Sequence, residues 1–191
     1  SPPTPELKTA AMNWMNRSNP AAKLLAASAL LFDPKYQGTV KLDLQQLRSH
    51  PDARIRNLAA TQLWRLELPD RKVEAATLVS WQDSIHSLPR ELRGGPYFLL
   101  GEGRRLRRQH DLAAMALLWV PLVYDHDYQI SALACLNAAD SLKAIGRNDE
   151  AVALYHEVVV RYGQSTYAQD AAQILKTLQS DQAESGTSQN P

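Results

Sequence analysis

The stretch that decides the fold is NAADSLKAIGRNDEAVALY, which covers residues 137–155. Its pattern predicts two helices joined by a turn, because apolar residues recur at helical spacing on both sides of a short polar segment. Small residues such as Ala139 and Ala151 allow the two helices to approach closely, while Leu142 and Tyr155 fill the space between them. We therefore expect these four residues to be buried together.

This stretch resembles a tetratricopeptide repeat, a unit of about 34 residues with the pattern Trp-x2-Leu-Gly-x2-Tyr, then Ala-x3-Phe, then Pro. The matching residues here are Cys135, Ala138, Ala139, Leu142, Ala151, Tyr155 and, in the proline position, Gly163. An earlier copy of the pattern consists of Tyr97, Leu100, Gly101, Arg104, Ala113 and Leu117. The interval from Gly101 to Ala139 is longer than one standard repeat. We expect the extra residues in the connection at Asp125-His126-Asp127, where a longer loop costs little.

The segment from Tyr155 to Ala168 is similar to repeats of bacterial envelope assembly and division proteins, in which a Tyr-Pro-x-Ser turn ends one repeat. Here Gly163 stands in the place of that proline. Residues 165–179 are expected to form a final helix that caps the stack. The resemblance implies an all-α fold, a right-handed superhelix of stacked helix pairs with its repeats in residues 94–180.

Residues 1–93 lack this repeat frame, and we expect either HEAT-like helix pairs or an irregular helical bundle there. Asn19-Pro20 and Pro51-Asp52 carry the capping signals that open helices. Gly94-Gly95-Pro96 predicts the boundary between the two halves of the chain. Residues 181–191 have few apolar side chains, and we predict a disordered tail. Helix should exceed about 60% of the chain, well above the usual one-third, and we expect no sheet.

The composition is ordinary for a soluble globular protein, with 45% hydrophobic and 21% charged residues. A formal net charge of +1 provides no general attraction to nucleic acid or to an anionic membrane. No apolar run approaches the 18 or so residues of a membrane helix, so we expect no integral membrane segment. The opening residues Ser-Pro-Pro-Thr-Pro resemble a linker, which leads us to expect a preceding segment.

The chain has a single cysteine, Cys135, which excludes an internal disulfide. The cysteine content therefore does not indicate the cellular compartment. The resemblance to envelope proteins favours a periplasmic or otherwise exported location, with a cytoplasmic one as the alternative.

In tetratricopeptide repeats the first helix of each pair lines the concave groove. The resemblance therefore implies a partner-binding groove with these residues: Phe98, Glu102, Arg105, Leu136, Asp140 and Lys143. Each repeat presents an apolar, an acidic and a basic residue in the same order. A protein or peptide could use the charges for orientation and the apolar pair for burial. The alternative is that each acid pairs with the basic residue three positions later on an exposed helix surface.

Arg104, Arg105, Arg107 and Arg108 form the densest basic cluster. On a helix, Arg104, Arg107 and Arg108 share one face, which could hold an acidic tail, a phosphate group or an anionic lipid surface. No aromatic residue interleaves with them as a base-stacking surface requires, so we do not expect nucleic acid as a partner. The alternative is an ordinary solvated helix face.

No arrangement typical of catalysis or of metal binding emerges from the sequence. Asp125-His126-Asp127 contains metal-capable side chains, but no second cluster completes a site, so we expect neither metal nor cofactor. Cys135 lies in an apolar context and is interpreted as a packing residue. The four tryptophans, Trp14, Trp64, Trp81 and Trp119, are predicted to lie in the core. No nucleophile triad or phosphate-binding glycine loop is present, and we do not expect an enzyme.

These observations favour a protein-interaction scaffold that binds a partner segment in the groove of a tetratricopeptide-like solenoid. One rival is a structural spacer or dimerisation domain of a larger exported protein. A second rival is a helical-repeat enzyme acting on envelope polymers. Facing acids would favour the enzyme, but each acid of the groove neighbours a basic residue. Assembly into a homo-oligomer is compatible with all three readings.

Overall fold

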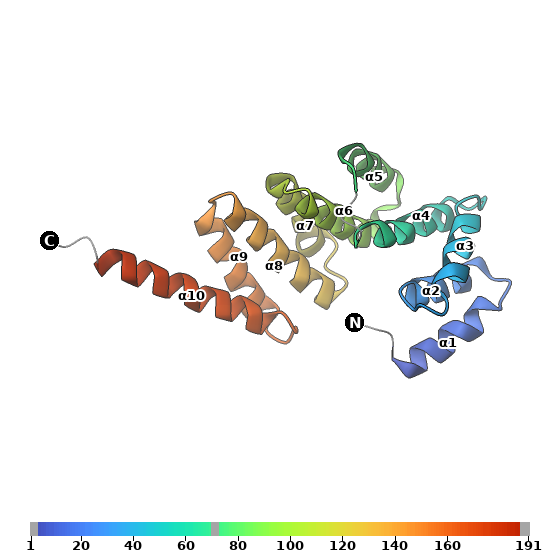
Figure 1. Cartoon of the computed structure of the whole chain (residues 1–191), viewed down its shortest axis with the longest axis horizontal. Coiled ribbons are helices and arrows are strands. Elements are labelled where there is room, and N and C mark those ends of the chain that lie inside the picture. The colour runs from blue at the N-terminus through green and yellow to red at the C-terminus, as the bar shows by residue number, and fades with distance from the viewer. Residues whose placement is uncertain (1–3, 70–72, 188–191) are drawn as a thin grey trace. The chain divides into compact units, whose positions relative to one another are not determined.

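Helices make up this fold (Figure 1). The computed structural model describes residues 4–69 and 73–187. In these residues ten α-helices and one short 3-10 helix account for 78% of the structure, and no strand occurs. The predicted all-α class and the predicted helix content are therefore confirmed. None of the described helices combines the length and apolar character needed to cross a bilayer.

The described chain forms two compact units. The first extends to Val73 and includes Ser87–Pro89, whereas the second contains Glu74–His86 and the chain from Arg90 onward. The division thus falls at residues 73 and 74, not after residue 93 as the sequence suggested. The reason is that the helix beginning at Ala75 packs with the second unit.

The first unit contains α1 (Pro5–Met15), α2 (Pro20–Leu30), α3 (Gln37–Leu47) and α4 (Ala53–Glu67). Two helix starts follow the predicted caps, because Asn19 Oδ1 accepts from the backbone N–H of Ala21 at 2.9 Å and Asp52 Oδ1 from that of Arg54 at 2.8 Å. α2 packs against α1, α3 and α4. The core they share is built mainly of alanine and leucine: Ala11, Leu24, Ala26, Ala27, Leu30, Leu31, Val40, Leu44, Leu47 and Ala59.

The second unit contains α5 (Ala75–Ser87), η1 (Arg90–Leu92), α6 (Gly94–Leu106), α7 (His110–Val123), α8 (Tyr128–Ala144), α9 (Asn148–Arg161) and α10 (Ala168–Thr187). From α6 onward each helix packs against the next one in the chain, and α6 also contacts α8 (Figure 1). This sequential packing gives two successive helical hairpins, α6–α7 and α8–α9, followed by α10.

Gly94-Gly95-Pro96 begins α6 rather than separating two halves of the chain. Pro96 lies in the first turn, where the backbone N–H that proline lacks would have no partner within the helix. A Cβ on Gly94 would come within 2.9 Å of Tyr124 Cβ, so glycine permits a close contact with the end of α7. Glycine and proline, which usually indicate a break between helices, form the first turn of a helix at this position.

The two hairpins turn in the same way. After α6, Arg108 adopts a left-handed conformation (φ 57°), and Gly146 does the same at the equivalent position after α8 (φ 78°). In both turns the next residue donates its backbone N–H back into the helix, Gln109 to Arg104 O and Arg147 to Leu142 O, each at 3.0 Å. This is the Schellman ending of a helix. The repeated geometry agrees with the register in which the sequence pattern aligns Gly101 with Ala139.

The extra residues between the two copies of the pattern lie in α8 and not in the preceding connection as expected. α6 has 13 residues and α8 has 17, although both end at equivalent positions. The added first turn of α8 contacts the segment that joins α9 to α10. Tyr128 OH donates to Arg161 O at 3.2 Å and accepts from Gln164 N–H at 3.3 Å, while Gln129 Oε1 accepts from Thr166 N–H at 3.4 Å.

Small residues lie where the paired helices meet. A Cβ on Gly101 would lie 2.5 Å from Leu117 Cγ, so only glycine fits at this crossing of α6 and α7. The equivalent residues of the next hairpin are Ala139 and Tyr155, and both are fully buried. The expected burial of Ala139, Leu142, Ala151 and Tyr155 is confirmed, with exposed fractions of 0%, 4%, 1% and 0%.

The helix α10 continues through Thr187, so residues 181–187 are helical instead of belonging to a disordered tail. Glutamine, alanine and glutamate in this segment favour a helix even though they provide little apolar surface. The remainder of the predicted tail, residues 188–191, lies outside the described residues.

The prediction that the tryptophans lie in the core is confirmed for Trp64 and Trp81 and in part for Trp14. Trp64 and Trp81 are buried, and Trp14 is half-buried and packs on the core of the first unit. The prediction for Trp119 is wrong, because 45% of this residue is exposed. Its ring stacks on Tyr97 with the ring centres 5.5 Å apart, so neighbouring aromatic rings and not a closed core hold it.

Candidate partner-binding site

Arg105 lies at the centre of a charged network that joins α6 to α8. Its guanidinium pairs with Glu102 on the same helix, with Nη1 3.1 Å from Oε1. It also pairs with Asp140 on α8, with Nη2 3.7 Å from Oδ2. The side chains of Arg105 and Asp140 are 29% and 39% exposed, so the network lies at the surface and is partly shielded from water. One basic residue therefore neutralises two acids that belong to different helices.

Two further residues complete this network. Asn137 Nδ2 donates to Glu102 Oε1 at 2.8 Å, which gives α6 and α8 a second polar contact. Tyr155 OH, from α9, donates to Asp140 Oδ1 at 2.7 Å. Burial, together with this hydrogen bond to a carboxylate, raises the pKa of the Tyr155 hydroxyl, which therefore stays protonated as a donor. We call Glu102, Arg105, Asn137, Asp140 and Tyr155 the bridging network.

The sequence pointed to three members of the bridging network and missed Asn137 and the role of the Tyr155 hydroxyl. Asn137 lies one helical turn before Asp140 and so shares its face, a signal that was present in the spacing. Tyr155 was interpreted only as a space-filling residue. A buried tyrosine hydroxyl needs a partner, and Asp140 is a residue that could have been proposed for it.

The alternative of two local salt bridges is realised only in part. Glu102 pairs with Arg105 three positions later, as that alternative requires. Asp140 pairs with Arg105 of the neighbouring helix, and Lys143 is an exposed residue outside the network. The contact between helices is favoured because Arg105 reaches both acids with one planar group.

The two apolar groove candidates contribute little surface. Leu136 is 7% exposed and belongs to the core, while Phe98 is half-buried on α6. Of the six predicted groove residues, the bridging network therefore brings together Glu102, Arg105 and Asp140. Phe98 and Lys143 lie on the same two helices with part of their surface accessible.

The predicted basic face is split by the structure. Arg104 is 8% exposed, and its Nη2 donates to Gln82 Oε1 of α5. Its burial lowers the pKa of the guanidinium, and nearby Asp111 opposes this shift. Arg107 and Arg108 are exposed at the turn between α6 and α7. Arg104 is thus a link between helices, which corrects its assignment to an exposed basic face.

The other polar candidates have structural partners. Asp125 pairs with Arg161 at 3.0 Å, and Asp127 Oδ1 accepts from the backbone N–H of Ile130 as the N-cap of α8. Cys135 is buried, which raises the pKa of its thiol to about 12. A thiol with this pKa is a poor nucleophile at neutral pH. These contacts support the interpretation of Cys135 as a packing residue.

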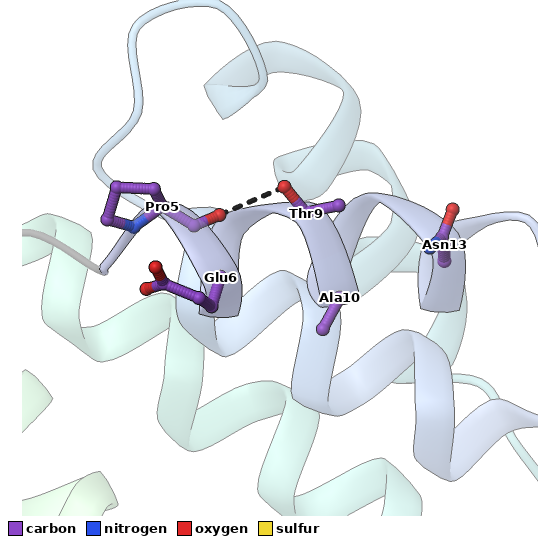
Figure 2. Close-up of a pocket in the computed structure, with 5 residues that line it drawn as sticks. All are labelled: Pro5, Glu6, Thr9, Ala10 and Asn13. Atoms are coloured by element: carbon purple, nitrogen blue, oxygen red, sulfur yellow. Dashed lines mark hydrogen bonds between the residues drawn. The ribbon is translucent and has the colours of Figure 1, made fainter.

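A shallow depression lies on α1 in the first unit (Figure 2). Its lining residues all come from this one helix: Pro5, Glu6, Thr9, Ala10 and Asn13. Thr9 Oγ1 donates to Pro5 O at 3.0 Å, so its hydroxyl is already engaged within the helix. Ligand sites are usually concave and enclosed by several elements. This depression therefore does not compete with the bridging network as the candidate site.

No protein-family model, curated protein or solved structure matches this chain.

Proposed function

We propose that this chain is a protein-interaction scaffold with a tetratricopeptide-like solenoid in its second unit. In this proposal a partner segment binds over the face that α6 and α8 share. The bridging network is the observation that carries the proposal. It fixes charged groups from α6 and α8 and a tyrosine hydroxyl from α9 in one place, and it leaves Arg105 and Asp140 partly accessible.

The recurrence of the hairpin geometry supports the solenoid. The two turns share their left-handed residue and their helix ending at equivalent positions, and the equivalent small residues Gly101 and Ala139 are both buried. Units that repeat in this manner stack on their neighbours and expose an extended face. Helices α6 and α8 are the first helices of the two hairpins and contact each other directly.

The accessible groups favour recognition of a protein segment. Polar atoms of the bridging network are held in position before a partner arrives, which lowers the entropy cost of binding. Phe98 and Lys143 add an apolar and a basic contact on the same helices. A segment with alternating polar and apolar side chains could pair with these groups, as peptides do in repeat-protein grooves.

The test is co-purification of partners from the native cell with three full-length variants. Lys143→Glu reverses an exposed charge beside the network. Asp140→Asn keeps the acceptor for Tyr155 and removes the ion pair with Arg105. Lys41→Glu makes the same charge change at an exposed position of α3 and is the control. We expect both second-unit variants to lose the same partner, with a loss of about 1–3 kcal/mol in binding free energy.

Purified partner and titration calorimetry then give the size of this loss, and circular dichroism checks that each variant is folded. Equal recovery of every partner by all three variants would reject the site and favour the structural-spacer rival, whose contacts lie elsewhere. Arg105 is unsuitable for charge reversal, because Glu102 and Asp140 would then lie beside a third acid.

A further inference from the structure

One face of α7 carries four large apolar residues that water can reach. Leu112, Met115, Trp119 and Leu122 are 37%, 65%, 45% and 72% exposed. Their spacing of three, four and three residues places them on a single stripe along the helix, as in the seam of a coiled coil. We call these four residues the α7 stripe. Exposed apolar surface of this extent is typical of an interaction site.

The stripe is particular to α7 and does not follow from the hairpin fold. The equivalent positions of α9, in the register that aligns Gly101 with Ala139, are Glu150, Ala153, Glu157 and Val160. Two of them are acids in ion pairs, with Arg147 and with Arg161. The same helix position thus has charged groups in one hairpin and large apolar groups in the other. A structural requirement of the hairpin would have imposed the same residues on both.

Charges of opposite sign lie at the two ends of the stripe. Arg107 and Arg108 are exposed at the turn that precedes α7. Asp125 and Asp127 are exposed in the connection that follows it, where Asp125 also pairs with Arg161 of its own chain and Asp127 caps α8. The basic cluster and the acidic segment that the sequence analysis singled out therefore flank one apolar surface. A partner must match a stripe that is basic at its beginning and acidic at its end.

We propose that this partner is a second copy of the chain, with the two α7 helices packed antiparallel about a twofold axis. The spacing of the stripe reads the same in both directions, so Leu112 meets Leu122 of the second copy and Met115 meets Trp119 of the second copy. The same axis places the arginines of one copy beside the aspartates of the other. A surface that is complementary to itself in this way forms an isologous dimer.

The stripe consists of four side chains on one helix, which is less than the roughly 800 Å² per partner of a standard interface. The dimer is therefore reversible and depends on concentration. This surface lies on α7, whereas the partner-binding proposal concerns α6 and α8, so either can fail without the other.

Sedimentation equilibrium of the full chain tests the dimer. The mass should rise from that of one 21.3 kDa chain toward twice this value as the protein concentration increases. Met115→Glu with Leu122→Glu should weaken association at least tenfold, because it buries like charges in the seam. The matched control is Val160→Glu, at the α9 position equivalent to Leu122, where 81% of the residue is exposed. This control should associate as the wild type does.

Disulfide trapping tests the orientation. A mixture of Leu112→Cys and Leu122→Cys chains should form a covalent dimer between the two variants, whereas neither variant alone should cross-link. The native Cys135 is buried and does not compete. Arg108→Glu should weaken association several-fold through repulsion at both ends of the seam.

Three results would overturn the proposal. The first is a wild-type chain that stays monomeric at every concentration, which would mean that another molecule or no molecule covers the stripe. The second is equal association of the wild type and the Met115→Glu/Leu122→Glu chain while circular dichroism shows both to be folded. The third is cross-linking of Leu112→Cys with itself, which would indicate parallel packing.

Discussion

At the scale of single residues, Arg108 has a left-handed backbone conformation that favours glycine. It has a φ of 57°, and the equivalent residue of the next hairpin is glycine. A side chain in this region costs about 1–2 kcal/mol, while glycine loses more chain entropy on folding. We expect Arg108→Gly to raise the free energy of unfolding by about 0.5–1 kcal/mol, measured by urea denaturation of dilute protein.

The reciprocal exchange is the control for this effect. Gly146→Arg should lower the free energy of unfolding by about 1 kcal/mol, because the space around Gly146 is open and only the backbone conformation opposes a side chain. The same sign of change for both variants would show that the backbone conformation does not decide the stability of these turns.

The sequence predicted an ion pair of the bridging network only where both partners lie on one helix. The Glu102–Arg105 pair follows from a spacing of three residues. The Arg105–Asp140 pair depends on how α6 lies against α8, which no local pattern contains. Arg104 illustrates the same limit, because a guanidinium that appears solvated in the sequence is buried once α5 packs nearby.

At the scale of elements, the crossing of α6 and α7 depends on one glycine. We expect Gly101→Ala to destabilise the chain by about 1–3 kcal/mol, because the new methyl group would overlap Leu117 and force the helices apart. Thermal unfolding by circular dichroism measures the change. Gly95→Ala is the matched control on the same helix, since no atom outside its chain neighbours and its own helix backbone lies within 4 Å of its added Cβ. It should change the free energy of unfolding by less than about 0.5 kcal/mol, because Pro96 opposes a Cβ on the preceding residue and offsets the gain in helix propensity.

An unchanged melting temperature for Gly101→Ala would show that the contact is looser than its geometry indicates.

Most helices were predictable because their caps and periodicity are local. Asn19 and Asp52 start α2 and α4 where their side chains can accept from the free backbone N–H groups. The error at Gly94-Gly95-Pro96 arose because proline is equally suited to a loop and to the first turn of a helix. The extra residues were placed in the connection at Asp125-His126-Asp127 because the repeat pattern alone does not distinguish an added helical turn from a longer loop; the N-cap at Asp127 shows that they belong to α8.

At the scale of the whole molecule, the division into two units predicts that the second can be separated from the first. A fragment of residues 74–191 should fold with helical circular dichroism and a single cooperative transition, because its helices pack mainly on one another. Differential scanning calorimetry of the fragment and of the full chain makes the comparison. A broad transition without cooperativity in the fragment would show that the first unit is needed to complete its core.

The position of this division could not be read from the chain, because α5 has no local feature that assigns it to either unit. Its buried residues Leu78, Trp81 and Ile85 show only that one face is covered. Which unit covers that face is a property of the folded molecule.

The added first turn of α8 has a mechanical consequence. Tyr128 and Gln129 hold the connection between α9 and α10 by side-chain hydrogen bonds, and the Tyr128 ring also meets Tyr162 edge to face with ring centres 5.3 Å apart. A force that pulls α10 away from the other helices would therefore act on these contacts before it separates α9 from α8. The added turn of α8 thus resists separation of the α9–α10 connection from α8 when tension is applied to α10.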